Sequence, residues 1–187
     1  MTSDGTRPVA DLAGVDRAFV LLSDTIAGMT EDEARGATRL PGWTRGHVLT
    51  HLARNADGQA RMVEGVLRDE VVEQYPGGDG QRTADIEAGA SRPVAELLAD
   101  VRVSQEGLVL AWSRVADDHW DRLTQARAGI RPVRDGVLSR WRELLVHLVD
   151  LDVGMTPAGL PEDYLRRDEA WLAEHRTRAA WPDADWT

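Results

Sequence analysis

Apolar residues recur at every third or fourth position along most of the chain, which is the spacing of one face of an α-helix. The stretch from Val9 to Met29 has this pattern, as do those from Thr44 to about Arg68, Pro93 to about Ala116, and Val137 to Val153. Alternation of polar and apolar residues, which is typical of strands, is nearly absent. Four long helices in 187 residues predict one all-α domain, residues 1–187, with the architecture of a four-helix bundle.

The segments between these helices are interpreted from their glycines, prolines and loss of periodicity. The glycine-rich segment Tyr75–Gly80 is expected to be a loop, with a short helix after it from Thr83 to Ala90. Residues 117–136 lack periodicity, so we expect an irregular crossover connection with a short hairpin there. Residues from Pro161 to about Ala180 predict a short peripheral helix at the C-terminal end.

The composition excludes several kinds of chemistry. The chain has no cysteine, and its 22 basic residues are all arginine. A cysteine nucleophile, a disulfide, a CxxC site, a Schiff-base lysine and a P-loop lysine are therefore ruled out. The net charge of -10 argues against broad binding of nucleic acid. No apolar run reaches the roughly 18 residues of a membrane span, and the N-terminus lacks the apolar region of a signal peptide, so we expect a cytoplasmic protein that binds neither nucleic acid nor membrane.

The helix from Val137 to Val153 carries a row of polar residues on an otherwise apolar segment. Arg140, Glu143, His147 and Asp150 recur three and four positions apart and therefore share one face. This row is either the solvent-exposed face, with Glu143 and His147 as a surface ion pair, or a functional site inside the protein. The spacing alone leaves both interpretations open.

The helix that follows Thr44 contains a second pair of residues at one-face spacing, His47 and His51. A single histidine in such a position is more often a core residue that bonds to a backbone carbonyl than a metal ligand. Imidazoles and a carboxylate on two helices are nevertheless the groups from which bundles build metal sites. Two histidines and one glutamate with an open fourth position are a known ligand set of catalytic zinc. A metal site is therefore one of the hypotheses.

Two segments carry a resemblance to a known family. Leu40–Gly58, LPGWTRGHVLTHLARNADG, is similar to the signature of the mycothiol-dependent maleylpyruvate isomerase family, within the DinB-like superfamily. Trp141–Leu151, WRELLVHLVDL, resembles that family's second signature, in which a glutamate and a histidine four positions apart are followed by an aspartate. The similarity covers about residues 8–170. It implies the family's N-terminal metal-binding domain, a DinB-like four-helix bundle with a divalent metal that is usually zinc.

The resemblance also implies which residues bind this metal. His51 matches the first ligand of the family, and Glu143 and His147 match the other two. His47 lies one turn before His51, and we expect it to have a structural role. A thiol that coordinates a metal loses its proton and becomes an activated thiolate. Because this chain has no cysteine, the thiol has to come from outside, and the family implies that it is mycothiol.

The family's reaction predicts further residues of the site. The thiolate would add to the cis double bond of a maleylpyruvate-like substrate, the resulting single bond would rotate, and expulsion of the thiolate would leave the trans product. Substrate carboxylates favour arginine, and Arg82 is predicted to be catalytic because it lies where the family pattern also has an arginine. Arg54, Asn55 and Asp150 are predicted to bind the thiol cofactor. Asp150 is also a candidate for a catalytic role or for orienting a metal ligand.

Several functions fit these observations. The isomerase competes with a mycothiol S-transferase that joins the thiol to an electrophile, with a hydrolase that uses metal-bound water, and with a helical bundle that keeps the signatures for packing alone. The expected partners are a low-molecular-weight thiol and an unsaturated dicarboxylate or another small electrophile, bound by a monomer or a homodimer.

Trp43 and Trp141 are expected in the core. Family members often carry an extra C-terminal α/β domain; we expect it to be absent because the chain ends at Thr187, and we expect the tail from Trp171 to cover the bundle instead.

Overall fold

A computed structural model describes residues 6–175 of the chain, and the elements in that range are mostly helical. The α-helices are α1 (Val9–Ile26), α2 (Glu31–Ala34), α3 (Arg45–Val66), α4 (Gly78–Ala90), α5 (Val94–Ser113), α6 (Val133–Asp150) and α7 (Glu162–His175). The remaining elements are two short 3₁₀ helices, Asp117–His119 and Pro157–Gly159, and two strands, β1 (Leu123–Ala126) and β2 (Gly129–Pro132). None of the helices described is long and apolar enough to cross a membrane.

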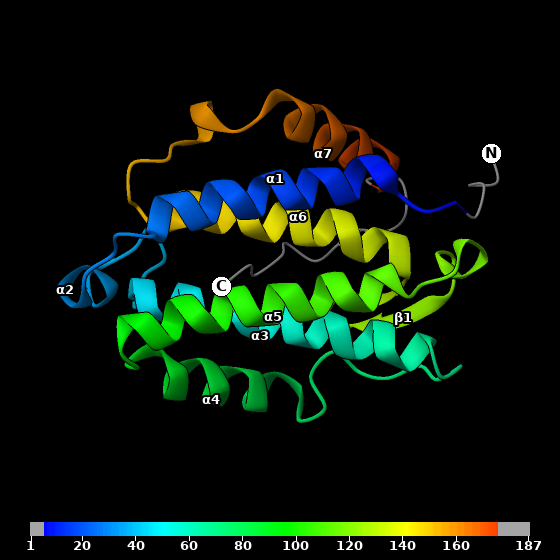
Figure 1. The fold of residues 1–187 in the computed structure, drawn as a ribbon, viewed down its shortest axis with the longest axis horizontal. Helices are drawn as coiled ribbons and strands as arrows, with labels where there is room; N and C mark the ends of the chain where they lie inside the picture. The colour runs from blue at the N-terminus through cyan, green and yellow to red at the C-terminus, as the bar shows by residue number, and fades with distance from the viewer. Residues whose placement is uncertain (1–5, 176–187) are drawn as a thin grey trace.

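The four long helices α1, α3, α5 and α6 form the predicted bundle. Figure 1 shows them in two layers, with α1 beside α6 and α3 beside α5, while α7 covers the outside of the first layer and α4 that of the second. Their inward faces supply one continuous core of buried aliphatic residues and tryptophans. Burial of this apolar face, more than intrinsic helix propensity, is what stabilises such helices. The all-α prediction is therefore confirmed, with one small hairpin as the exception.

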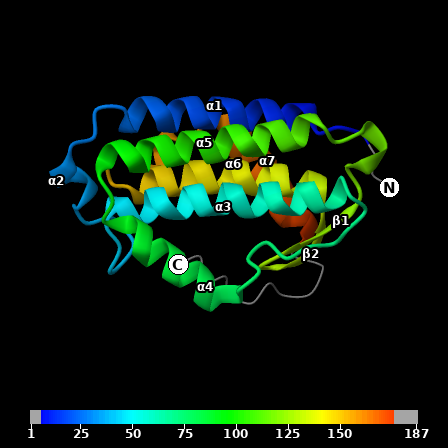
Figure 2. The ribbon, with the colours of Figure 1, turned by 60° about the horizontal axis from the view of Figure 1, so that its bottom comes forward.

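The crossover connection of the bundle lies elsewhere than predicted. Three contacts show that α3 and α5 run in the same direction: position 46 faces Leu97, Arg54 pairs with Asp100, and Glu64 pairs with Arg114. The segment that joins this parallel pair is residues 67–93, which include α4. Residues 117–132 instead join α5 to α6 at one end of the bundle (Figure 2). The prediction of a crossover at 117–136 was wrong, although the hairpin predicted within it is present.

Two helices begin earlier than their sequence predicted. Helix α4 starts at Gly78, inside the expected loop, and packs against α3 through Arg82 and Ile86, which are both buried. Helix α6 starts at Val133, directly after Pro132, and includes Gly136. At Gly136, which is buried, packing outweighs the low helix propensity of glycine, whereas Gly78 is exposed and begins α4 at a φ of 66°, which glycine adopts readily. A substituent at Gly136 would meet only the Gln59 side chain, at 3.5 Å, so that glycine fits against α3.

The hairpin is hydrogen-bonded to the segment that precedes α4. Strand β1 pairs antiparallel with β2, and Glu73 forms an isolated bridge with Gln125. The amide of Gln74 donates to the carbonyl of Gln125 at 3.0 Å, and the amide of Arg127 donates to Oε1 of Gln74 at 3.1 Å. The hairpin and residues 73–75 therefore form one wall beside the end of α3 (Figure 2).

Helix α7 is peripheral, as predicted, and is held by ion pairs. Arg167 forms a bidentate pair with the buried Asp11 of α1, with Nε and Nη2 each 2.9 Å from a carboxylate oxygen. Asp168 pairs with Arg142 of α6, whose guanidinium lies over the ring of Trp171. Trp171, the first residue of the predicted covering segment, thus contacts the bundle, whereas Leu172 and Ala173 are exposed and the end of that segment falls outside the described residues.

Candidate metal centre

The first candidate ligand, His51, is set in place by the start of α3. Thr44 caps this helix: its side chain accepts from the amide of His47, and Nδ1 of His47 accepts from the amide of Thr44 at 3.1 Å. Nε2 of His47 lies 3.3 Å from Glu87 on the surface. His47 therefore has the structural role that we expected. His51, one turn later, points toward the interior and is 4% exposed.

The other two candidate ligands lie on the polar face of α6, which points inward. Arg140 is fully buried and His147 is 4% exposed, whereas the apolar Val146 is 38% exposed. The interpretation of the polar row as a solvent-exposed face is therefore wrong. Helices α3 and α6 run antiparallel, so that His51 lies beside Glu143 and His147, and Asn55 lies beside Arg140 one turn further along.

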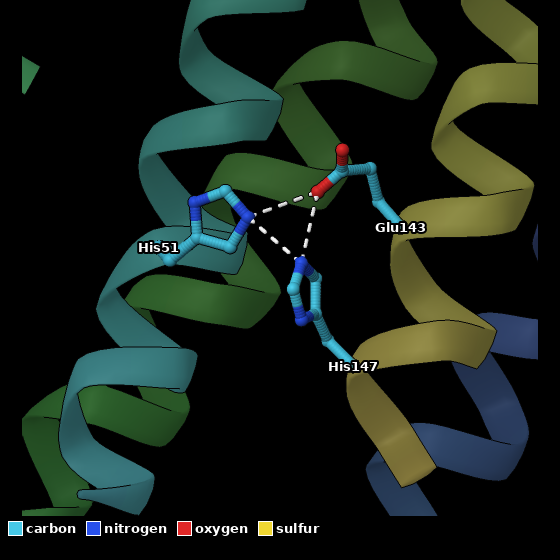
Figure 3. A group of neighbouring side chains, drawn as sticks. All are labelled: His51, Glu143 and His147. Atoms are coloured by element: carbon cyan, nitrogen blue, oxygen red, sulfur yellow. Dashed lines mark hydrogen bonds and ion pairs between the residues drawn. The ribbon is translucent and has the colours of Figure 1, made fainter. Parts of the chain in front are cut away.

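The three predicted ligands converge on one point (Figure 3). Nε2 of His51 is 2.9 Å from Oε2 of Glu143 and 3.1 Å from Nε2 of His147. Nε2 of His147 is 3.4 Å from the same glutamate oxygen. All donor atoms of the group lie within 4.8 Å of one another. Of the described residues, these alone form such a group of histidines and acidic residues.

The donor atoms fit a divalent metal. Bonds of about 2.0–2.1 Å to a tetrahedral ion place its ligand atoms roughly 3.3 Å apart, and the three observed separations lie close to that value. Two imidazole nitrogens and one carboxylate are donors that zinc accepts, and three protein ligands leave one position open. The residues could therefore hold a metal, whose identity the donor set alone does not fix.

Hydrogen bonds and burial set the charge of this group in the metal-free protein. Burial lowers the pKa of His51 to about 4, so its imidazole is neutral at neutral pH. Burial opposes protonation of His147 too, but hydrogen bonds to Asp150 and Glu143 outweigh it and raise the pKa of His147 to about 9. Burial likewise disfavours the charge of Glu143, and the two histidines hold the pKa of its carboxyl well below the usual value. Glu143 is therefore ionised and available as a ligand.

Asp150 lies behind the candidate ligand His147. Its Oδ2 is 2.9 Å from Nδ1 of His147, on the far side of the ring from the cluster. A carboxylate in that position fixes the imidazole proton on Nδ1 and leaves the Nε2 lone pair for a metal. Of the roles predicted for Asp150, the orientation of a metal ligand is the one that this contact supports.

A cavity opens beside the cluster and is lined by arginines. His51, Asn55 and Glu143 form part of its wall, together with Tyr75 and Trp171. Four arginines also line it, namely Arg82 from α4, Arg127 and Arg131 from the hairpin, and Arg142 from α6. A cavity with this lining suits an anionic ligand.

Arg82 lies where a catalytic arginine was predicted. It is 8% exposed, and its Nη2 is 3.1 Å from Nδ1 of His51. Its guanidinium also lies 5.9 Å from the ring centroid of Tyr75. Burial raises the pKa of Tyr75, so that this phenol stays neutral. Arg82 therefore borders both the candidate ligand and the cavity.

The residues predicted to bind the thiol lie in different places. Asn55 is buried on the cavity wall, and its Oδ1 accepts from Nη1 of Arg140 at 3.0 Å and from Gln59 at 3.1 Å. Arg54 does not line this cavity: it pairs with Asp57 at 3.1 Å and with Asp100 at 2.5 Å, and it borders a neighbouring hollow that shares Arg82 and Tyr75 with the first.

The two tryptophans predicted to be core residues also differ. Trp141 is buried against α1, where it closely approaches Gly14. Trp43 is half-buried and lies edge-on to the ring of His51, with 5.7 Å between ring centroids. Trp43 therefore shields a candidate ligand instead of filling the centre of the bundle.

The sequence interpretation missed three residues near the site. Arg131 and Tyr75 line the cavity from segments without periodicity, and no sequence signal singles them out. Arg140 was visible as part of the polar row on α6. Its guanidinium donates to the carbonyl of Leu52 and to Gln105, both at 2.9 Å, as well as to Asn55. Arg140 thus joins α6 to α3 and α5 directly behind the cluster.

Comparisons with known proteins agree with this fold. Residues 15–152 match the family model described as the mycothiol maleylpyruvate isomerase N-terminal domain. A crystal structure of the mycothiol-dependent maleylpyruvate isomerase is similar over 92% of this chain and 72% of that chain, with 25% identity and a TM-score of 0.83. A histidine-to-alanine mutant of that isomerase gives 24% identity and a TM-score of 0.82, with the same coverage. No curated protein sequence matches. Because the family model spans most of the chain, this protein belongs to the family of the mycothiol maleylpyruvate isomerase N-terminal domain.

Proposed function

We propose that this protein is a metal-dependent enzyme that uses mycothiol as its thiol cofactor to isomerise the cis double bond of a maleylpyruvate-like dicarboxylate. The observation that carries the proposal is the buried cluster of His51, Glu143 and His147 on the wall of an arginine-lined cavity. Membership of the family supports the choice of thiol and reaction. Zinc, or another divalent metal, is proposed as the resident ion.

The protein's own residues would prepare the site in three ways. His51, Glu143 and His147 would hold the metal, which when bound lowers the pKa of a thiol that coordinates it. Asp150 would keep the proton of His147 on Nδ1. Trp43 would exclude water from one side of His51.

The position of Arg82 supports a role in substrate binding. In the metal-free protein its Nη2 lies within hydrogen-bonding distance of Nδ1 of His51. A neutral imidazole that binds a metal through Nε2 carries its proton on Nδ1, so that it can no longer accept from a guanidinium. A bound metal would therefore leave Arg82 without this acceptor. A substrate carboxylate in the cavity would supply another.

The test is thiol-dependent turnover by the zinc-loaded protein. Maleylpyruvate and mycothiol are incubated with the enzyme, and both the trans product and free thiol are measured. We expect trans product with no net loss of thiol. Loss of one thiol per molecule of substrate would indicate S-transferase activity instead. Conversion of the substrate in the absence of thiol would indicate hydrolysis by metal-bound water.

Variants connect the turnover to the cluster. Glu143→Gln removes the ligand charge with little change of shape, so we expect loss of both bound zinc and activity. His119→Ala, which changes a histidine outside the cluster, is the matched control and should retain both. If the wild type binds no divalent metal and Glu143→Gln changes only stability, the protein is a bundle that keeps the signature for packing.

A further inference from the structure

The hairpin contributes to the cavity an arginine, Arg131, that forms no ion pair with a carboxylate of the described residues. Of the four cavity arginines, Arg127 pairs with Asp79 at 2.7 Å and Arg142 pairs with Asp168. Arg131 forms no ion pair with any carboxylate of the described residues, and neither does Arg82. The Nε of Arg131 is buried and has no hydrogen-bond partner among those residues. Arg131 as a whole is partly buried, and a buried nitrogen without a partner is unfavourable, which suggests that its partner is a ligand.

The backbone of Arg131 is firmly held although its side chain is not paired. Arg131 lies opposite Thr124 in the hairpin, and Oγ1 of Thr124 donates to the carbonyl of Arg131 at 2.9 Å. The tip of the hairpin is tied to Gln74, and at its base the amide of Val133 donates to the carbonyl of Arg122 at 3.0 Å. These hydrogen bonds fix the position of the backbone from which the Arg131 side chain extends.

The electrostatic surroundings of Arg131 agree with an anionic ligand. Burial lowers the pKa of the Arg131 guanidinium, and the nearby charges of Asp135 and Glu143 only partly offset this effect. If Glu143 binds a metal, its charge is largely neutralised and supports Arg131 even less. A substrate anion would then be the group that restores a favourable partner.

We propose that Arg131 is a second anion-binding residue of the site, which with Arg82 selects substrates that carry two carboxylates over those that carry one. Arg82 comes from α4 and Arg131 from β2, so the two guanidiniums reach the same cavity from different elements. Each can bind one carboxylate through paired hydrogen bonds. The proposal rests on the proposed function, since it assumes that the substrate binds beside the metal cluster.

The test measures binding of two small probes to the zinc-loaded protein by calorimetry. Maleate carries two carboxylates on a cis double bond, and isocrotonate carries one. We expect the wild type to prefer maleate by about tenfold to a hundredfold, the effect of one charged hydrogen-bonded contact. In Arg131→Gln we expect maleate affinity to fall by a similar factor while isocrotonate affinity changes little. Arg131→Lys should retain part of the preference, because it keeps the charge and loses the paired geometry.

Two controls test whether the effect of Arg131→Gln comes from lost ligand binding, and not from a change in folding or in the net charge of the protein. Arg102→Gln removes the same charge from an exposed ion pair with Glu106 on α5 and should bind both probes as the wild type does. Arg131→Gln should retain its zinc, and its thermal midpoint should stay the same or rise, because a partly buried charge without an ion-pair partner is removed. A residue with a purely structural role would lower the midpoint instead.

The outcomes distinguish this proposal from the proposed function. The role of Arg131 is overturned if Arg131→Gln keeps the wild-type preference for maleate, if the wild type has no preference, or if the wild type binds neither probe. Binding of maleate that depends on Arg131, without thiol-dependent turnover, would support the anion site and reject the isomerase. Turnover of maleylpyruvate by Arg131→Gln with the wild-type KM would support the isomerase and reject the anion site.

Discussion

At the scale of single residues, the unusual feature is the number of polar groups buried where α3 meets α6. His51, Asn55, Arg140 and His147 are all buried, and each has at least one hydrogen-bond partner on the facing helix or on its own. Buried polar groups are costly unless they are paired, so such a group is retained either for function or for specificity of packing. The convergence of three donor atoms at His51, Glu143 and His147 favours function.

Asp150 provides the prediction at this scale. We expect Asp150→Asn to weaken zinc binding by about tenfold to a hundredfold, because the amide is uncharged and supports the Nδ1 proton of His147 less well. Zinc affinity is measured by competition with a chelator. Asp118→Asn is the control, since Asp118 also lies beside a histidine, His119, but on the surface. Unchanged zinc affinity with reduced turnover would instead assign Asp150 a direct catalytic role.

At the scale of elements, the position of α3 depends on a close contact with α4. The start of α3 approaches the end of α4 so closely that a Cβ at Gly46 would lie 2.0 Å from the carbonyl oxygen of Ala90. That atom belongs to the backbone and cannot turn aside. This contact keeps α4, and with it Arg82, next to the turn of α3 that carries His51.

Gly46→Ala tests the contact. We expect it to lower the free energy of unfolding by about 1–3 kcal/mol, because the helices have to move apart. Gly107→Ala in α5 is the matched control: no atom lies within 4 Å of the position that a Cβ would take there, so it should stabilise the protein by roughly 0.5–1 kcal/mol through helix propensity. Both values come from denaturant titrations. Equal stability of the two variants would contradict the close approach of α3 and α4.

The elements also show how far the sequence could predict this fold. The helical faces of α1, α3 and α5 follow directly from apolar spacing, which is a local property. The early starts of α4 and α6 could not be predicted, because the glycines there disfavour helix locally, and both helices are stabilised by residues that pack against α3 further along. The crossover was misplaced because chain direction depends on which helices pair, and spacing within one helix contains no such information.

At the scale of the whole molecule, the charge distribution is uneven. The chain carries 32 acidic and 22 basic residues, yet four arginines gather in one cavity. A molecule with net negative charge repels anions at long range, so recognition of an anionic substrate has to come from these nearby groups. The candidate metal ligands lie in the same region, and their protonation would couple metal binding to the stability of the whole protein.

The pH dependence of stability is the prediction at this scale. In the metal-free protein the pKa of His147 is raised from 6.5 to about 9, so its contribution to stability is complete below pH 6.5 and is lost as the pH rises through 9. The pKa of His51 is lowered to about 4, so its contribution is present above pH 6.5 and is lost as the pH falls toward 4. Because of these two residues, we expect the metal-free protein to be most stable near pH 6.5.

We expect zinc to change this dependence, because it would have to displace the proton of His147. We expect the dissociation constant of zinc to fall by about tenfold per pH unit between pH 6.5 and 8.5, and the zinc-induced rise in thermal midpoint to grow accordingly. Thermal melts with and without zinc at several pH values measure the effect. His147→Ala should show no such pH-dependent rise. A zinc effect that is the same at all pH values would contradict the proton displacement.

The sequence by itself determined the helical class and the two helix faces that carry His51, Glu143 and His147. It could do so because periodicity depends on residues a few positions apart. Only the tertiary structure decided that the polar face of α6 points inward, that Asp150 lies behind His147, and that Arg131 reaches the same cavity as Arg82. These features depend on contacts between segments that are distant in the chain, and local spacing cannot specify them.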